Sequence, residues 1–486
     1  MTAAAERSGV SKHIAVVGAG LGGLRSAEQL RAAGHDGPVT VIGAEPHLPY
    51  SRPPLSKELL AHELLGGGGG APEAAGAADD LGALHQRVAF RRRASVAGVT
   101  FRLGTAVTGT DLTSGTLALA DGGTARFDGL IAATGLRPRR LTVPGPAGPG
   151  SGRHVLRTLD DMAALRAGLR AALRDAASLA PSAPVPSPPV LAPAGAGPAT
   201  ASGGLPRPRV VVVGGGFVGC EVACTARWLG CDVTVVEPAG PPMLRVLGAE
   251  VAAAVQASHE RAGIGFVIGR AVIAYAGQDR VTGVVLADGT DADGSGFSGA
   301  RIPAGQALAG AVLPADLVVE AIGSVPNTEW LASVGLDLTD GVLCDNSLAA
   351  HPAGRPWAVV AAVGDVARFP NPLFDDVPRR VEHWSMPTDT ARRAAVTVTA
   401  RLAGDPVDTT PFRPLPSFWS DQGELRMWSF GSPGLADEVT VAEGDLREPA
   451  RGLLATYRRA GRLVGSVAVN LPPLRHRELR EALLAQ

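Results

Sequence analysis

Two segments of this 486-residue chain share one pattern, and that pattern restricts the fold more than any other feature. In each segment a short run of β-branched residues leads into G-x-G-x-x-G, and a helical pattern follows. The runs are HIAVV (13–17) and RVVVV (209–213). The motif glycines are Gly18, Gly20 and Gly23 in the first segment and Gly214, Gly216 and Gly219 in the second. We therefore predict an α/β chain with two strand–helix–strand units, whose parallel strands are buried on both faces.

Each unit continues with an apolar strand and an acidic residue, at residues 39–42 before Glu45 and at residues 232–236 before Glu237. In such a unit the glycines let the backbone approach a pyrophosphate at the positive end of the helix dipole. The acid accepts hydrogen bonds from an adenosine ribose. Two complete copies predict two bound dinucleotides, and the chemically compatible pair is a flavin that stays bound and a nicotinamide that exchanges.

The second loop also indicates which nicotinamide cofactor binds. Glu237 lies where the ribose 2′-hydroxyl is expected, and a 2′-phosphate there would meet a like charge. The residues that follow, Pro238, Ala239 and Gly240, offer no arginine to receive a phosphate. We therefore expect NADH rather than NADPH.

Composition excludes several other classes of protein. The chain carries 45 basic and 46 acidic residues, a balance that disfavours nucleic acid or anionic lipid as its main partner. Apolar residues form 45% of it, which is enough for a folded core. The first residues show no signal-peptide pattern, and no apolar run approaches the ~18 residues that span a bilayer. We expect a cytoplasmic protein.

Three stretches of low complexity interrupt the chain, at residues 66–82, 178–208 and 288–310. Because they are rich in glycine, alanine, proline and serine, we interpret the first and third as surface insertions and residues 178–208 as a disordered linker. The end of the chain alternates short strands and closes on a charged helix at 476–484. That pattern predicts a separate small α+β domain.

Further motifs lie outside the two glycine loops. They are PYSRPPLSK (49–57), ATG (133–135) with PRRL (138–141), LRTLDD (156–161), GSVPNTEW (323–330), VGDVARF (363–369), EHW (382–384) and FWSDQ (418–422). In combination the chain resembles the flavin-dependent ferredoxin reductases that serve cytochrome P450 and ring-hydroxylating oxygenase systems, within the glutathione-reductase-like superfamily. The likeness runs from about residue 12 to the end, apart from the three stretches above.

The resemblance implies two Rossmann-like dinucleotide-binding domains and a small C-terminal α+β domain. A discontinuous FAD domain (1–150 and 326–405) would enclose an NADH domain (151–325), and residues 406–486 would cover the flavin. Asp365 would bond the ribityl chain of FAD. The other cofactor-binding residues that the resemblance implies are Arg52, Lys57, Thr134, Gly135, Gly323, Gly364 and Trp384.

Lysine occurs only at Lys12 and Lys57, whereas arginine supplies the other 43 positive charges, so a lysine inside a motif stands out. By the resemblance, Lys57 lies beside the flavin and pairs with Glu221, which faces the isoalloxazine. We expect both to be catalytic. A compact ammonium stabilises negative charge on reduced flavin, and its partner can move when the nicotinamide stacks.

Many members of the superfamily pass electrons through a redox dithiol beside the flavin, but SRPPLSK (51–57) has no cysteine at that place. We interpret Cys220 and Cys224 as small core residues of one helix, without the further soft ligands that a metal site requires. A disulfide reductase is therefore disfavoured, and no metal is expected. NADH would deliver a hydride, and single electrons would then leave for a [2Fe–2S] ferredoxin.

Ferredoxins are usually acidic, so we expect a basic docking face, with Arg379, Arg380, Arg392 and Arg393 as candidates. Trp384 and Trp419 either shield the flavin or simply pack. Two other functions stay open. One is a same-fold NADH flavoenzyme with another acceptor, namely rubredoxin, a nitrite-reductase partner, quinone or oxygen. The other is an NADH-sensing signalling flavoprotein. We expect a monomer or a weak dimer.

Overall fold

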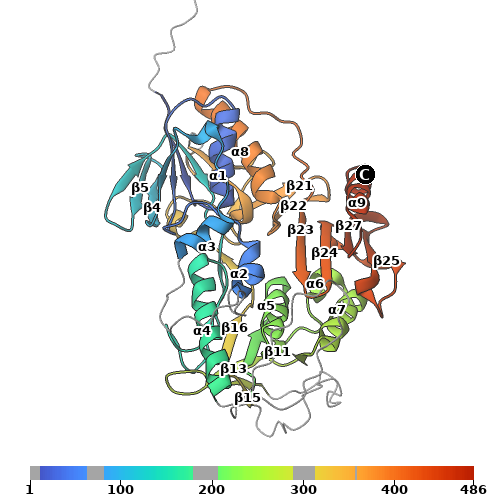
Figure 1. Ribbon diagram of the computed structural model, residues 1–486. Coiled ribbons are helices and arrows are strands. Elements are labelled where there is room, and N and C mark those ends of the chain that lie inside the picture. The colour runs from blue at the N-terminus through green and yellow to red at the C-terminus, as the bar shows by residue number, and fades with distance from the viewer. Residues whose placement is uncertain (1–10, 63–80, 179–205, 288–311, 356–357, 486) are drawn as a thin grey trace, which may run out of the picture. The chain divides into compact units, whose positions relative to one another are not determined.

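The computed structural model describes residues 11–62, 81–178, 206–287, 312–355 and 358–485 (Figure 1). The chain divides into two compact units, each assembled from separated segments. The first unit contains the chain up to Ser51, Val88–Arg137 and Val325–Phe418, and the second contains Arg52–Arg87, Pro138–Ser324 and the chain from Trp419 onward. The three low-complexity stretches lie outside the described residues, apart from a few residues at their ends. The division into three domains stays a prediction.

A six-stranded sheet forms the core of the first unit. Its strands in spatial order are β19 (Ala349–Ala350), β20 (Val359–Ala362), β7 (Gly129–Ala132), β1 (Ile14–Val17), β2 (Val39–Ile42) and β3 (Thr100–Arg102). β1 pairs in parallel with both β2 and β7, and all four of its residues are buried. This is the place expected for a strand that is apolar on both faces.

Two helices, α1 (Leu21–Ala32) and α8 (Met386–Ala403), pack together and against this sheet (Figure 1). α1 buries Leu24, Ala27 and Leu30, the helical spacing of an inward face. Two smaller sheets complete the unit. They are β4 (Val107–Asp111), β5 (Thr116–Leu119) and β6 (Thr124–Arg126), and β18 (Val342–Leu343), β21 (Ala367–Asn371) and β22 (Asp375–Arg380).

The second unit repeats the central arrangement with a five-stranded parallel sheet. Its strands in spatial order are β12 (Ile264–Ile268), β11 (Asp232–Glu237), β10 (Arg209–Val213), β16 (Leu317–Glu320) and β9 (Arg153–His154). Its helices before the C-terminal part are α2 (Glu58–Ala61), α3 (Leu81–Val88), α4 (Leu159–Ser178), α5 (Phe217–Trp228), α6 (Leu244–Leu247) and α7 (Ala249–Arg261), and α3 ends at the boundary of the units. A three-stranded sheet consists of β13 (Val272–Ala276), β14 (Gly283–Leu286) and β15 (Val312–Pro314).

The LRTLDD motif forms the start of α4. The backbone N–H of Asp161 donates to Thr158 Oγ1 at 3.0 Å, and the N–H of Thr158 donates to Asp161 Oδ2 at 2.9 Å. This reciprocal pair satisfies two donors that would otherwise be unpaired at a helix start. The motif therefore has a local structural function.

The C-terminal part of the chain forms a five-stranded sheet followed by one helix. The strands in spatial order are β23 (Ser417–Gln422), β24 (Leu425–Gly431), β27 (Arg462–Val469), β26 (Leu453–Arg459) and β25 (Glu438–Gly444), and α9 spans Pro473–Leu484. β8 (Leu136–Pro138) pairs with β17 (Ser324–Pro326), and the boundary of the two units falls within both strands.

The predicted α/β class and the two strand–helix–strand units with buried parallel strands are confirmed, and so is the mixed helix and strand content of the C-terminal part. Within the part of the chain that the structure describes, no helix is both long and apolar enough to cross a membrane.

Candidate functional site: two dinucleotide cradles

The first glycine of each loop lies against the backbone of the strand beside it. Gly18 has φ +115° and Gly214 has φ +105°, a backbone conformation that favours glycine. A Cβ on Gly18 would lie 2.1 Å from the carbonyl oxygen of Ala133, and one on Gly214 would lie 2.4 Å from that of Ala321. Both loops therefore require glycine for the same two reasons.

The third glycine of each loop lets the following helix pack closely against the first glycine of that loop. A Cβ on Gly23 would lie 1.9 Å from the carbonyl oxygen of Gly18, and one on Gly219 would lie 2.1 Å from that of Gly214. The middle glycines, Gly20 and Gly216, are the N-caps of α1 and α5, and no side chain caps either helix. Each helix start thus offers its first backbone N–H groups to an anion.

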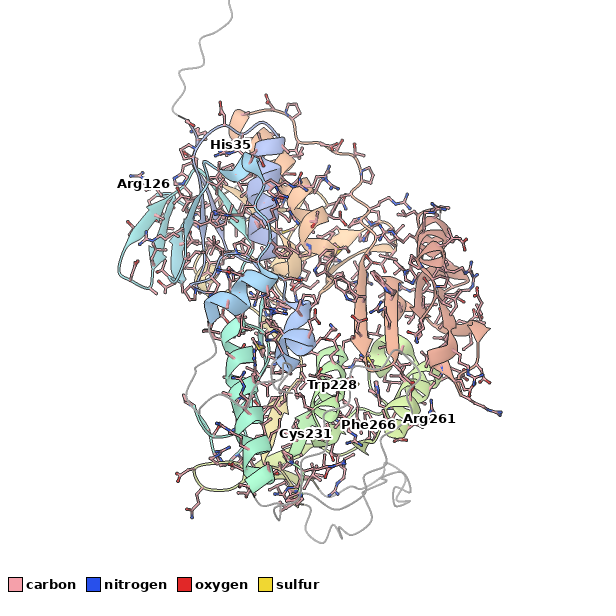
Figure 2. The ribbon with its side chains drawn as sticks, in the orientation of Figure 1. His35, Arg126, Trp228, Cys231, Arg261 and Phe266 are labelled. Atoms are coloured by element: carbon pink, nitrogen blue, oxygen red, sulfur yellow. The ribbon has the colours of Figure 1, made fainter. Side chains whose placement is uncertain are left out.

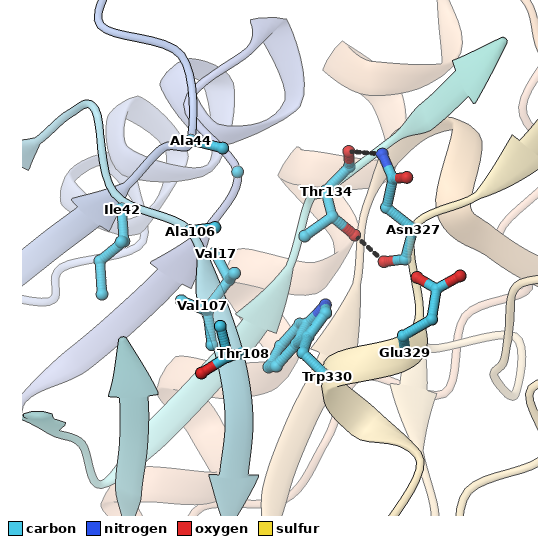
Figure 3. Close-up of a pocket in the computed structure, with 11 residues that line it drawn as sticks. Val17, Ile42, Ala44, Ala106, Val107, Thr108, Thr134, Asn327, Glu329 and Trp330 are labelled. Atoms are coloured by element: carbon cyan, nitrogen blue, oxygen red, sulfur yellow. Dashed lines mark hydrogen bonds between the residues drawn. The ribbon is translucent and has the colours of Figure 1, made fainter. Parts of the chain in front are cut away.

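Next to the first loop lies a cavity of about 390 Å³, shown in Figure 3. It is lined by Val17, Gly18, Ile42, Ala44, Ala106, Val107, Thr108, Thr134, Asn327, Glu329 and Trp330. Thr134 Oγ1 donates to the carbonyl of Asn327 at 2.6 Å, and Asn327 Nδ2 donates back to the carbonyl of Thr134 at 3.1 Å. The indole N–H of Trp330 is buried and has no acceptor among the described residues. The cavity thus has a mixed lining, apolar on the side of Val17, Ile42 and Val107 and polar at Thr108, Thr134, Asn327 and Glu329, and its residue Trp330 has a buried indole donor.

Other residues expected to bind the first cofactor gather at the carboxyl edge of the same sheet. Thr134 and Gly135 follow β7, and Gly364 and Asp365 follow β20, which runs parallel to β7. Ligands of open α/β sheets bind at this edge. The backbone N–H of Gly364 donates to Thr390 Oγ1 of α8 at 2.9 Å, which fixes the turn. Trp384, by contrast, is 44% exposed.

Glu45 lies further beyond the end of its strand than Glu237 does in the second unit. In the strand registers, Val17 pairs with Ile42 and Val213 pairs with Val236. The residue after Val236 is Glu237, whereas the residue after Ile42 is a glycine, so the first acid comes two positions later. The Glu45 carboxylate accepts the hydroxyl of Tyr50 at 2.5 Å. Its ribose contact stays a prediction.

Glu237 is the last residue of β11, and its carboxylate is held against the second loop. Oε2 accepts the backbone N–H of Gly215 at 2.8 Å, and Oε1 accepts that of Ala239 at 2.9 Å. Gly323, one of the residues expected to bind a cofactor, follows β16 of the same sheet and has φ +95°. The acid is therefore oriented before any ligand arrives.

Lys57 and Glu221 form the ion pair that the sequence suggested. Lys57 Nζ lies 2.9 Å from Glu221 Oε1, and the Lys57 side chain is 14% exposed and that of Glu221 7% exposed. The carboxylate also accepts two hydroxyls, from Ser56 at 2.5 Å and from Ser420 at 2.6 Å. A buried ion pair needs further hydrogen bonds to offset the cost of removing it from water, and the two hydroxyls supply them to this carboxylate.

Sequence reasoning missed Ser56 and Ser420 as partners of Glu221. Both stand in quoted motifs, Ser56 in PYSRPPLSK and Ser420 in FWSDQ, but nothing in either motif indicates a common carboxylate. Arg52, expected beside the flavin, donates from Nη1 to the carbonyl of Arg157 at 2.6 Å. That contact attaches the motif to the start of α4.

The four cysteines are free. Cys220, Cys231 and Cys344 are buried, and Cys224 is partly buried. Burial raises the pKa of Cys224, Cys231 and Cys344 to about 12, and it raises that of Cys220 well above the usual range. Cys231 immediately precedes β11 near Trp228, at the end of the strand opposite to Glu237 (Figure 2). Thiols at these positions are poor nucleophiles, because the thiolate is the reactive form.

We expect the thiols to take no part in turnover. An aromatic disulfide reagent at neutral pH should leave the native protein unreacted and should count four thiols after denaturation. The count in denaturant should be the same before and after anaerobic reduction with NADH. A count that rises by two on reduction would reveal a redox disulfide and contradict this account.

The expected docking arginines divide into two groups. The expectation is wrong for Arg380 and Arg393, whose side chains are only 11% and 9% exposed. Arg380 pairs with two carboxylates, and Arg393 pairs with Asp408 at 2.7 Å, so both serve the fold. Arg379 and Arg392 stay candidates. Among the described residues, no group of three or more His, Cys, Asp or Glu side chains is arranged to hold a metal ion.

Comparison with known proteins gives consistent results. A family model described as pyridine nucleotide-disulphide oxidoreductase matches residues 12–395. The ferredoxin–NAD(+) reductase component of the anthranilate 1,2-dioxygenase system from Burkholderia cepacia is 32% identical over 464 residues, 94% of this chain and 90% of that protein. Putidaredoxin reductase CamA from Pseudomonas putida is 28% identical over 468 residues, 95% of this chain and 89% of that one.

Solved structures agree. A covalent putidaredoxin reductase–putidaredoxin complex superposes with a TM-score of 0.73 at 27% identity, covering 98% of this chain and 94% of the other. A ferredoxin reductase from Rhodopseudomonas palustris gives a TM-score of 0.71 at 31% identity, covering 96% and 92%.

Proposed function

Since this chain belongs to the pyridine nucleotide-disulphide oxidoreductase family, we propose that it takes a hydride from NADH onto FAD and passes electrons singly to a [2Fe–2S] ferredoxin. The motif-based resemblance to ferredoxin reductases is confirmed by the relatives. One observation carries the proposal: two matching dinucleotide cradles occur in a chain whose four cysteines are free thiols with raised pKa values. Electrons that arrive at the first cofactor must therefore leave it without a dithiol.

We assign FAD to the first unit, and the residues there fit it. The cavity of about 390 Å³ is within the size range of cofactor pockets, and the buried indole N–H of Trp330 offers a donor to a polar ligand. Gly18, Gly20 and Gly23 would hold the pyrophosphate, and Asp365 the ribityl chain. When bound, FAD supplies the ability to accept two electrons together and release them one at a time.

We assign NADH to the second unit. Gly214, Gly216 and Gly219 would hold the pyrophosphate, and the oriented Glu237 carboxylate would accept the ribose hydroxyls. As part of the proposal, Lys57 and Glu221 act where the hydride is transferred. The Lys57 ammonium would stabilise developing negative charge, and Glu221 would hold that ammonium in place.

Glu237→Ala should weaken the preference for NADH. In the unmutated protein the carboxylate would repel a 2′-phosphate, so kcat/KM for NADH should exceed that for NADPH by at least tenfold, the equivalent of ~1.4 kcal/mol. In Glu237→Ala the ratio should fall toward unity. Glu237→Gln removes the charge but keeps the size of the side chain, and it should also lower the ratio of kcat/KM for NADH to that for NADPH. Equal use of both cofactors by the unmutated protein would refute the assignment of Glu237.

The proposed acceptor follows from the relatives, whose names include reductase components of dioxygenase systems and putidaredoxin reductase. We propose that the ferredoxin in turn feeds a ring-hydroxylating oxygenase or a cytochrome P450. A cytoplasmic location and a monomeric or weakly dimeric state stay predictions.

A coupled assay tests the proposed function. The purified yellow protein is mixed with NADH, and cytochrome c reduction is followed with and without each of a panel of [2Fe–2S] ferredoxins. We expect turnover that depends on ferredoxin. Equal rates without ferredoxin would instead indicate an oxidase or a flavoenzyme with another acceptor. A stable NADH complex that never turns over would indicate a signalling flavoprotein.

A further inference from the structure

The Glu221 carboxylate is the end point of a buried chain of side chains within the second unit. Ser420 Oγ donates to Glu221 Oε1 at 2.6 Å and accepts Gln422 Nε2 at 3.0 Å. Gln422 Oε1 lies 2.8 Å from His259 Nε2, and His259 Nδ1 lies 3.7 Å from Cys224 Sγ. The chain thus connects α5, β23 and α7.

The Glu221 carboxylate sets the direction of every hydrogen bond in this series of side chains. A carboxylate only accepts, so the Ser420 hydroxyl must donate to Glu221. That hydroxyl then accepts from the amide nitrogen of Gln422, which leaves the amide oxygen to face His259. His259 must therefore carry its proton on Nε2 and accept at Nδ1.

Burial and charge state at the far end agree with this direction. Ser420, Gln422 and His259 are 1%, 0% and 2% exposed. Burial lowers the pKa of His259, so the ring is neutral and has one donor nitrogen. Burial raises the pKa of Cys224 to about 12, so its thiol keeps the proton that it can offer to Nδ1. A second N–H of Gln422 reaches the sulfur of Met243 at 3.4 Å, which favours the same amide orientation.

We propose that Ser420, Gln422 and His259 are positioning residues that hold the Glu221 carboxylate in one orientation through a one-way hydrogen-bond chain. The inference rests on the proposed function, in which Glu221 holds the Lys57 ammonium for hydride transfer. Ser420 alone would be free to rotate, but Gln422 occupies its acceptor site and leaves it only the donor role. The FWSDQ motif therefore acts on the NADH unit through Ser420 and Gln422.

Rapid-mixing measurements on the holoenzyme test the functional part. Ser420→Ala removes one donor from a charged acceptor, so the rate of flavin reduction by saturating NADH should fall about tenfold. Ser420→Thr keeps the hydroxyl and should restore that rate to within about twofold. Ser466→Ala is the matched control, because Ser466 is 1% exposed in the same sheet and its hydroxyl has no partner among the described residues. That control should leave the rate unchanged.

Gln422→Glu tests the direction of the chain. A carboxylate at this position cannot donate to Ser420, so it should turn the hydroxyl away from Glu221 and slow flavin reduction at least as much as Ser420→Ala. Electron delivery to ferredoxin after chemical reduction with dithionite should stay unchanged in both variants. That result separates a positioning effect on the NADH step from general loss of structure.

The tautomer of His259 gives a readout that needs no turnover. In ¹⁵N-histidine NMR spectra of the oxidised holoenzyme, with the His259 signal assigned by its loss in His259→Gln, the proton should lie on Nε2. A proton on Nδ1 would overturn the proposal whether or not the protein reduces ferredoxin. So would a Ser420→Ala rate within twofold of the unmutated rate. Failure of the unmutated protein to accept electrons from NADH would refute the proposed function. The tautomer of His259 would then still test the direction of the hydrogen-bond chain.

Discussion

Replacing Gly216 with alanine is expected to weaken NADH binding strongly while the protein stays folded and yellow. Gly216 has φ −75°, which alanine adopts freely, and a Cβ there would meet no atom of the described residues within 4 Å. Its only expected neighbour is the pyrophosphate, which the backbone approaches at this position. Loss of hydrogen bonds to a charged group, ~1.5–3 kcal/mol, would raise the KM for NADH by at least tenfold.

The measurement is anaerobic reduction of the bound flavin, followed by its visible absorption. Dithionite should bleach Gly216→Ala as it does the unmutated protein, whereas NADH at ordinary concentrations should not. Gly98→Ala is the matched control, since a Cβ at Gly98 also has no neighbour within 4 Å in the part of the chain that the structure describes, and this exposed position lies outside both loops. An unchanged KM in Gly216→Ala would mean that NADH does not bind the second cradle.

Lys57→Met is expected to slow hydride transfer from NADH by about 100-fold to 1,000-fold, the range found when one electrostatic stabiliser of a transition state is removed. The substitution also leaves a buried carboxylate without its cation, which alone costs about 3–5 kcal/mol of stability. The double variant Lys57→Met/Glu221→Gln removes that unpaired charge and should recover stability without recovering rate. Lys57→Arg keeps the charge but not the compact shape, and we expect it to stay slow.

The chain provides its own control for this experiment, because Lys12 is its other lysine. Lys12 is 52% exposed and lies 3.5 Å from Asp128, a surface pair of small energetic weight. NADH should therefore reduce the flavin of Lys12→Met at the rate of the unmutated protein. If the flavin of Lys57→Met is also reduced at that rate, the Lys57 ammonium has no part in hydride transfer and its proposed catalytic role is wrong.

The features that the sequence predicted well are those encoded locally. β1 and residues 210–213 of β10 are continuous apolar runs, and each is followed directly by the glycines of a tight turn. α1 and α5 begin directly after Gly20 and Gly216, earlier than their helical patterns become clear. Local sequence is sufficient here because strand, turn and helix are consecutive.

The features that the sequence did not predict depend on contacts between distant residues. Ser56 and Ser420 meet Glu221 across 165 and 199 positions of the chain, a convergence that no spacing rule reveals. β25 (Glu438–Gly444) is almost wholly exposed, so it lacks the alternation that marks a half-buried strand. The sequence suggests that Arg393 is a surface charge, and only the structure shows that it is buried and paired with Asp408.

The most direct test of the central claim is an anaerobic titration that counts electrons. Purified holoenzyme in catalytic amount is mixed with excess oxidised [2Fe–2S] ferredoxin and limiting NADH, and the reduced ferredoxin is quantified by its electron paramagnetic resonance signal. The account predicts about two spins for each NADH oxidised, because one hydride carries two electrons and the carrier accepts one. NADH consumption without any ferredoxin signal would contradict it.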